Sequence, residues 1–387
     1  MTTIMQGFPP AEEDRATLAN WRGRPWSPWA FRHVREIVPT AGIANDPDDV
    51  WRLPEGRIDL SGVDLDAAME ETSADAVVIL HEGRLVHEAY RNGMGPDDTH
   101  IIFSVSKSLL GLIAGALVER GEIAVEDLAE KYVPELKGSA YQGVTIRQLL
   151  DMRAGILFNE DYLAATGPIV DYRYAANWNP VPAGVEAGDL RSFMSKVTEP
   201  DGPHGGRFHY CSPNTDLLGW VFERATGTRY ADLLEERLWR PLGAERPADI
   251  TVDRIGGARA AGGICVTARD LARVGMMLAD GGQREGRRII PAAWIEDIET
   301  AGDPDAWDNG DFRDNFSGRK MHYRSKWYVQ RGEAPLVHGL GIHGQYVFFD
   351  RGARLSVAWL ASRHEPIEDP TTERAICTVE AIREAVR

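Results

Sequence analysis

The sequence has only three cysteines among its 387 residues, Cys211, Cys265 and Cys377, and no two of them form a C-x-x-C pair. Three scattered thiols are too few for a disulfide framework and lack the spacing of a structural zinc site. The chain also lacks an apolar run of about 18 residues, and its N-terminal stretch lacks a charged segment followed by an apolar one. We therefore expect reduced thiols in a soluble, cytoplasmic protein.

Basic residues are scarce as well. Lys and Arg total 43 against 59 Asp and Glu, which gives a formal net charge of −16. Such a chain should be repelled by phosphate backbones and by anionic lipid, so we expect neither a nucleic-acid nor a membrane partner. No P-loop or dinucleotide fingerprint is present, and no cluster of His, Asp and Glu has zinc spacing. We accordingly predict no metal and no organic cofactor.

What the sequence does contain, at 43% hydrophobic residues, is enough apolar material for a sizeable core. Two β-rich runs at 76–80 and 85–90 surround the turn-like pair Glu82-Gly83, which indicates a hairpin. Apolar residues with helical spacing follow at 104–120, 145–155, 214–227, 230–239 and 267–282. Strand patterns return at 326–330, 344–350 and 354–362, and an amphipathic helix at 371–386 closes the chain.

This order predicts an α+β fold in which an antiparallel sheet is flanked by helices from both chain ends. We expect residues 1–70, which are rich in Trp and Pro, to pack on the main body as an extension without chemistry. Residues 71–105 and 272–387 should form the α/β lobe, and residues 106–271 an inserted, mainly helical lobe. The active site is expected between the two lobes.

The start of the helix predicted at 104–120 is unusually polar for an apolar segment. Ser104 and Lys107 form an S-x-x-K pattern, and residues three apart lie on one helical face about 5–6 Å apart at Cβ. A buried lysine can lose its proton near neutral pH and then activate a serine hydroxyl. The simpler interpretation is that Ser104 caps the helix and Lys107 is solvated.

A second polar stretch, "FHYCSPNTDLLGW" at residues 208–220, follows a glycine-rich loop and precedes another amphipathic helix. Tyr210 in this stretch could complete a proton network with Ser104 and Lys107, because a phenol close to an ammonium group can ionise or relay a proton. Alone, a tyrosine before a helix usually contributes only packing.

Together these segments resemble the serine β-lactamase and D-alanyl-D-alanine peptidase superfamily, in its class C and esterase branch. The similarity is carried by "SVSK" at 104–107, "TIRQLLDMRAGI" at 145–156, the Tyr-x-Ser site at 210–212 and "RLWRPLGAE" at 237–245. Within this superfamily, "NEDY" at 159–162 and "GIHGQ" at 341–345 are most similar to the nylon-oligomer hydrolases, which cleave 6-aminohexanoate dimers.

The resemblance implies a role for each matched residue. Ser104 corresponds to the nucleophile, Lys107 to its base and Tyr210 to the group that passes a proton to the leaving amine. The oxyanion would be held by the backbone N–H groups of Ser104 and Ile342. Where β-lactam-recognising enzymes have Lys-Thr-Gly, this chain has Gly-Leu-Gly at residues 339–341, which offers no side-chain donor for a substrate carboxylate.

The same resemblance nominates residues for substrate binding. Tyr162 corresponds to a tyrosine that closes over the amide, Asp171 to an aspartate that receives a terminal ammonium, and Trp178 to a pocket tryptophan. Ser212 stands where the lactamases have Asn, and Ala261 where the dimer hydrolases have a polar side chain, which makes efficient hydrolysis of the nylon dimer itself doubtful. The candidate set is Tyr162, Asp171, Trp178, Ser212, Ala261 and Trp327.

Alternatives remain at this point. His338 and His343 suggest a Ser/His/Asp triad, but no G-x-S-x-G elbow surrounds any serine. The leading prediction is a serine hydrolase for small-molecule amides and short-chain esters, and the resemblance suggests a possible homodimer. The chain could instead be chiefly a carboxylesterase, or a binding protein of the same fold that acylates without turnover.

Overall fold

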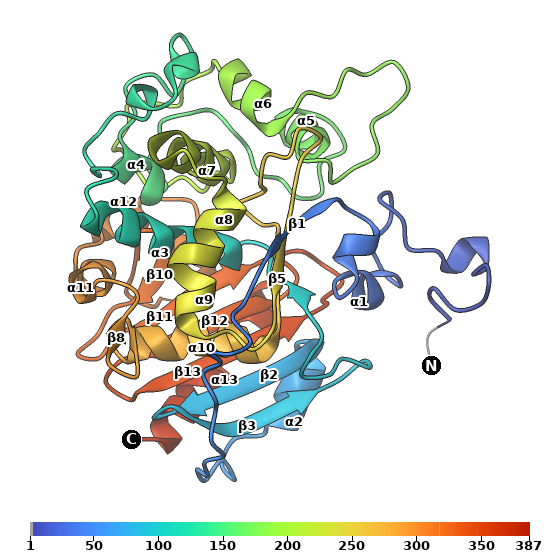
Figure 1. Ribbon diagram of the computed structural model, residues 1–387, viewed down its shortest axis with the longest axis vertical. Helices are drawn as coiled ribbons and strands as arrows, with labels where there is room; N and C mark the ends of the chain where they lie inside the picture. The colour runs from blue at the N-terminus through green and yellow to red at the C-terminus, as the bar shows by residue number, and fades with distance from the viewer. Residues whose placement is uncertain (1–2, 317) are drawn as a thin grey trace.

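A seven-stranded antiparallel sheet organises the protein in the computed structural model, which describes residues 3–316 and 318–387 (Figure 1). The strand order is β3-β2-β13-β12-β11-β10-β9, so the first and last parts of the chain meet at the pairing of β2 with β13. The strands are β2 (Ala74–His81), β3 (Arg84–Tyr90), β9 (Met321–Arg324), β10 (Trp327–Gln330), β11 (Leu336–Gly341), β12 (Gln345–Asp350) and β13 (Leu355–Ala361).

The predicted hairpin is present as β2 and β3, joined at Glu82 and Gly83. Both turn residues have positive φ, 49° and 75°, as a tight turn between right-twisted strands requires. Gly83 accepts this backbone at no steric cost. The expected α+β class with an antiparallel sheet is therefore confirmed.

Alternate residues of the sheet face two different cores. On one face, Val78, Leu80 and Val347 pack with helix α10 (Ala268–Ala279) and helix α3 (Val105–Glu119). On the other face, strand residues pack with α2 (Leu65–Glu71) and α13 (Asp369–Ala385). The sheet is thus covered on both sides, which explains why every residue of β12 and β13 is buried.

The remaining helices gather mostly at one end of the molecule, away from β2 and β3 (Figure 1). Helix α3 is central to the fold, since all of its residues from Val105 to Leu117 are buried. The other α-helices are α1 (Ser27–Ala30), α4 (Ile146–Leu150), α5 (Pro168–Ala175), α6 (Leu190–Lys196), α7 (Pro213–Thr226), α8 (Tyr230–Leu234), α9 (Arg240–Leu242), α11 (Ala292–Thr300) and α12 (Pro304–Asp308).

A second, four-stranded sheet was not predicted. Its order is β1-β5-β6-β4, and its strands are β1 (Thr40–Ile43), β4 (His100–Ile101), β5 (Ala248–Thr251) and β6 (Ile264–Val266). These strands are two to four residues long, too short to give a clear alternating pattern in the sequence. Two-residue strands β7 (Gln283–Arg284) and β8 (Arg287–Arg288) form a separate pair.

The N-terminal segment is more than a surface extension. Its strand β1 pairs with β5, and Trp21 and Phe31 are buried in the same core as α3. Trp21 stacks on Phe103, the residue that precedes Ser104. The segment therefore supports the backbone next to the candidate nucleophile. No helix in the described ranges is long and apolar enough to cross a membrane.

Candidate active site

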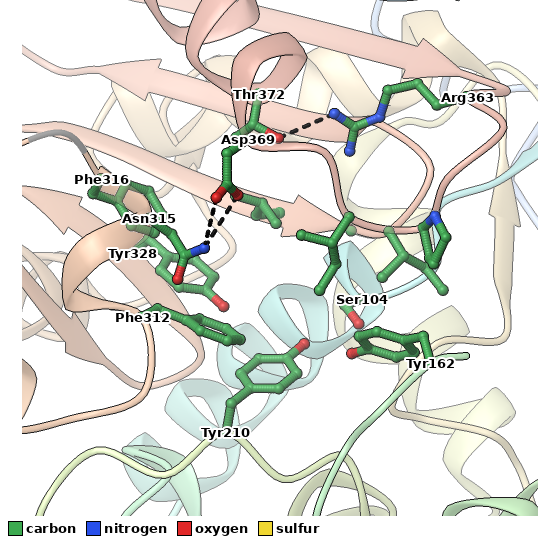
Figure 2. A pocket seen from close by; sticks show the side chains of 15 residues that line it. Ser104, Tyr162, Tyr210, Phe312, Asn315, Phe316, Tyr328, Arg363, Asp369 and Thr372 are labelled. Atoms are coloured by element: carbon green, nitrogen blue, oxygen red, sulfur yellow. Dashed lines mark hydrogen bonds between the residues drawn. The ribbon is translucent and has the colours of Figure 1, made fainter. Parts of the chain in front are cut away.

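The Ser104 side chain opens into a pocket between the end of β11, the start of α13 and loops from the helical end of the molecule (Figure 2). The hydroxyl groups of Tyr162 and Tyr210 both point toward Ser104. Aromatic rings make up much of the wall, and they come from Tyr162, Tyr210, Phe312, Phe316 and Tyr328. A small organic substrate could therefore pack against apolar surface with only a few polar groups near the serine.

Ser104 occupies the N-cap position of α3, yet its hydroxyl makes no capping hydrogen bond. Phe103 before it has a φ of 40°, an uncommon backbone for a bulky residue that the surrounding packing must hold in place. The simpler interpretation, in which Ser104 only caps the helix, does not agree with this geometry. The hydroxyl is free for another partner.

That partner is Lys107, whose Nζ lies 2.7 Å from Ser104 Oγ and donates a second hydrogen bond to the carbonyl of Ala261 at 2.6 Å. Lys107 is 1% exposed, so the alternative of a solvated ammonium is excluded. Burial lowers the pKa of Lys107 from 10.5 to about 8, and the nearby Glu160 carboxylate opposes this shift. About a tenth of the side chains would then be neutral at pH 7.

Tyr210 completes the cluster. Lys107 Nζ lies 5.1 Å from the centre of the Tyr210 ring, and Asp311 accepts a hydrogen bond from the Tyr210 backbone N–H at 2.9 Å. Burial raises the pKa of the Tyr210 phenol well above its usual value, Glu160 adds to the rise, and a hydrogen bond with Ser104 opposes it. The phenol is therefore neutral in the resting site. Of the two roles predicted for it, ionisation and proton relay, this environment favours proton relay.

Two residues that line the pocket have backbone N–H groups without an acceptor among the described residues. They are Ser104 and Ile342. Gly341 lets the two segments approach closely, because a Cβ added there would lie 3.0 Å from the Ser104 nitrogen and 2.7 Å from the Ile102 oxygen. Free amides beside a nucleophile, one of them at a helix N-terminus, suit a developing oxyanion.

Glu160 is a site residue that the sequence analysis missed. Its carboxylate accepts hydrogen bonds from the Tyr162 hydroxyl at 2.8 Å, from the Ser212 backbone N–H at 2.6 Å and from the Ser212 hydroxyl. It thereby ties the loop that carries Tyr162 to the start of α7. The only sequence signal was its place two residues before Tyr162 in "NEDY".

Asp216 on α7 supports the other side of Lys107. It accepts a hydrogen bond from the Ala261 backbone N–H at 2.8 Å, and it pairs with Arg259 and the Tyr172 hydroxyl, all in the buried interior. This network holds the peptide whose carbonyl accepts from Lys107. Its members were not predicted, because they are separated by more than 40 residues in the chain.

Four nominated substrate-binding residues do not reach the pocket as expected. Asp171 is exposed on α5 and lines a different cavity, together with Phe158 and Tyr174. Trp178 is buried beside Trp21 and Phe103 and donates to Thr251 Oγ1 at 3.1 Å. Neither residue lines the Ser104 pocket, so both assignments to substrate binding are corrected.

Trp327 and Ser212 are the other two. Trp327 is fully buried in the core against Phe349, whereas its neighbour Tyr328 lines the pocket, because successive strand residues point to opposite faces. The Ser212 hydroxyl is occupied by Glu160. Ala261 is near the chemistry, but through its carbonyl rather than its buried side chain. Of the six residues nominated for substrate binding, Tyr162 alone lines the pocket.

The two histidines offer no alternative base for Ser104. His338 is buried between Phe316 and Tyr328 without a hydrogen-bond partner among the described residues, and burial lowers its pKa to about 3. His343 Nδ1 contacts the Arg363 carbonyl oxygen at 2.9 Å, and burial lowers its pKa to about 3 as well. Neither hydrogen-bonds to Ser104, and both should stay neutral throughout the physiological range.

This fold, with a serine and a buried lysine at the start of a central helix, defines a hydrolase of the serine β-lactamase type. A family model described as Beta-lactamase matches residues 65–376, and the chain belongs to that family. It is an enzyme of the serine hydrolase class.

Two relatives are similar over nearly the whole chain. A 6-aminohexanoate-dimer hydrolase of Paenarthrobacter ureafaciens is 37% identical over 362 residues, which cover 93% of this chain and 91% of that protein. A solved structure from Bacillus anthracis, assigned as a 6-aminohexanoate-dimer hydrolase, has a TM-score of 0.85 at 25% identity and covers 97% of this chain and 98% of its own. The resemblance to nylon-oligomer hydrolases is thus confirmed.

More distant structures share the fold alone. A family VIII carboxylesterase has a TM-score of 0.61 at 18% identity, and the alignment covers 86% of this chain and 99% of that one. Amide and ester hydrolases are therefore both represented among proteins of this architecture.

Proposed function

We propose that the protein hydrolyses linear amides and short-chain esters through an acyl-enzyme on Ser104. The observation that carries this proposal is the 2.7 Å contact between the Ser104 hydroxyl and a buried lysine whose pKa is lowered to about 8. A neutral amine at this position can accept the hydroxyl proton as the oxygen attacks a carbonyl carbon.

Each later step also has a group in place. The tetrahedral oxyanion is stabilised by the N–H groups of Ser104 and Ile342. Collapse of this intermediate breaks the bond to the leaving group, which takes a proton from Tyr210, and Lys107 restores the proton to Tyr210. A water molecule, deprotonated by the same base, then attacks the acyl carbon and releases the acid with Ser104 restored.

Two features support amides such as those of 6-aminohexanoate as substrates. The relative with 37% identity is named for hydrolysis of the 6-aminohexanoate dimer, and the Tyr210 hydroxyl, which points toward Ser104, can donate a proton to a leaving amine. The Gly-Leu-Gly at residues 339–341 lacks the side-chain donors that hold a β-lactam carboxylate, so we expect little turnover of a chromogenic cephalosporin.

The runner-up is an enzyme that acts chiefly as a carboxylesterase, which the shared fold of a family VIII carboxylesterase favours. Tyr210→Phe tests amide hydrolysis that depends on a proton from Tyr210, because an amine must be protonated to leave whereas a p-nitrophenolate need not be. We expect kcat/KM to fall about a hundredfold on N-butyryl-6-aminohexanoate and less than tenfold on p-nitrophenyl butyrate. Wild-type protein that hydrolyses the ester but not the amide would instead establish the carboxylesterase.

The pH dependence of kcat/KM tests whether Lys107 is the base. Because the lowered pKa makes Lys107 neutral above about pH 8, kcat/KM for p-nitrophenyl butyrate should increase with pH and level off near pH 9. Between pH 7 and pH 8 we expect a rise of about fivefold, matching the growth of the neutral fraction. Initial rates corrected for spontaneous hydrolysis give the profile. If kcat/KM continues to rise toward pH 10.5, Lys107 keeps its ordinary pKa.

A further inference from the structure

Arg363, which follows β13, is a buried cation that has no anionic partner in the part of the chain that the structure describes. It is 3% exposed and lines the Ser104 pocket, yet no carboxylate of the described residues forms an ion pair with it. Most arginines of this chain are paired with Asp or Glu at the surface or in the interior. A guanidinium taken out of water without a counter-charge is costly, so its position calls for an explanation.

One nitrogen of the Arg363 guanidinium stabilises the fold. Nη1 donates to the Glu368 carbonyl oxygen at 3.1 Å and to the hydroxyls of Thr371 and Thr372, which anchors the start of α13. Among the described residues Nε is buried without a hydrogen-bond partner, and Nη2 has none either but is not enclosed. The guanidinium of Arg363 therefore retains at least one N–H group, on Nη2, that can donate to a molecule in the pocket.

The surroundings hold this donor in place. Gly344, with a φ of 90°, leaves room for the side chain, because a Cβ added there would lie 3.1 Å from Nε. In Figure 2, Arg363 and Asp369 lie on the opposite side of the pocket from Tyr162 and Tyr210, with Ser104 between them. Asp369 is exposed and accepts from the Asn315 amide, and it does not pair with Arg363.

We propose that Arg363 binds a carboxylate of the substrate, located away from the bond that is cleaved. This inference rests on the proposed hydrolysis at Ser104 and narrows the substrate class to amides or esters that carry a free acid. A carboxylate at Nη2 gains a charge-assisted hydrogen bond and supplies the missing counter-charge. Arg363 thus provides the anion contact that the Gly-Leu-Gly segment at 339–341 cannot provide.

Two substrate pairs that differ only in the acid test this assignment. On the acyl side we compare mono-p-nitrophenyl glutarate with p-nitrophenyl valerate. On the leaving side we compare N-butyryl-6-aminohexanoate with its carboxamide. The wild type should prefer the acid at least about tenfold in kcat/KM in one pair, the size of one hydrogen bond to a charged group, and Arg363→Gln should bring that ratio close to one.

Two further variants distinguish carboxylate binding by Arg363 from a purely structural role of Arg363. Thr371→Ala removes one anchor of Arg363 without changing its charge, and the ratio should persist. Asp369→Asn removes a repelling charge from the same pocket, and the ratio should rise. If Arg363 is only structural, Arg363→Gln lowers both members of each pair equally and the ratio does not change, which overturns the inference; so does a wild type without preference in either pair.

Failure of the inference and failure of the proposed function give different results. If the wild type hydrolyses none of the four compounds, the function is wrong, and calorimetric binding of the same compounds to Ser104→Ala still tests Arg363. Tighter binding of the acid in one pair, abolished by adding Arg363→Gln, supports the carboxylate site. Equal binding of acid and neutral compound, or a preference that survives Arg363→Gln, refutes it.

Discussion

Ser104→Ala should reduce kcat for p-nitrophenyl butyrate by about 10⁴-fold or more, because no covalent intermediate can form without the hydroxyl. Lys107, Tyr210 and the two backbone N–H groups remain in place in this variant, so substrate should still bind. The hydroxyl makes no capping hydrogen bond but accepts one from the buried Lys107, so its loss should lower the free energy of unfolding by about 1–2 kcal/mol. Steady-state rates and a melting curve on the same preparation provide the measurement.

Ser106→Ala is a matched control two residues away. The Ser106 hydroxyl accepts a hydrogen bond from the Ile264 backbone N–H at 3.1 Å, so its removal should lower the free energy of unfolding by about 1 kcal/mol while hydrolysis persists. Labelling with a fluorophosphonate followed by peptide mass spectrometry should modify Ser104 in the wild type and in Ser106→Ala. Hydrolysis that survives Ser104→Ala, or a label on another serine, would contradict the proposal.

The same mass spectrometry addresses the binding-protein alternative. After mixing with an activated ester, a hydrolase should show the acyl adduct only briefly at steady state, because water attack restores the free serine. An adduct that persists after the ester is exhausted would indicate a protein that acylates without turnover.

Lys107→Met should reduce kcat/KM by about 10³-fold, within the range expected for loss of a general base. Methionine has nearly the length of lysine and is suited to a buried position, so the fold should tolerate it. Lys107→Arg is the companion variant, since it keeps the positive charge but cannot become a neutral base at any accessible pH.

The pair distinguishes two roles for Lys107. If the residue acts as a base, both variants lose activity to a similar extent and neither shows the rise in rate near pH 8. If it acts only as a charge that orients the serine or stabilises an anion, Lys107→Arg keeps most of the activity. The second result would remove the base from the mechanism while leaving Ser104 as the nucleophile.

Much of the fold was accessible from local patterns. The hairpin at Glu82-Gly83 was predicted because two β-rich runs surround a turn-like pair, and the structure has the turn there. Helices α3, α7, α10 and α13 were found from apolar spacing that lasts for three turns or more. The short strands β1, β4, β5 and β6 escaped notice because each depends on a partner far along the chain.

The residues of the candidate site likewise fall into those predicted from local patterns and those that needed other information. Ser104 and Lys107 are three residues apart in a helix, so their contact follows from helical geometry that any S-x-x-K helix would have. Tyr162 and Ile342 entered through resemblance to a family, and both line the pocket. Trp327 was chosen where Tyr328 was needed, because a resemblance alone does not establish which face of a strand a residue occupies.

By itself the sequence determined the local chemistry: a hydroxyl and an amine one helical turn apart, and an acidic chain with apolar segments long enough to form a sheet and its covering helices. Only the tertiary structure decided that Lys107 is buried and has a lowered pKa, that Glu160 joins Tyr162 to Ser212, and that Arg363 is left without a counter-ion. The physical reason is that burial and charge pairing depend on segments distant in the chain, and these meet only when the chain has folded.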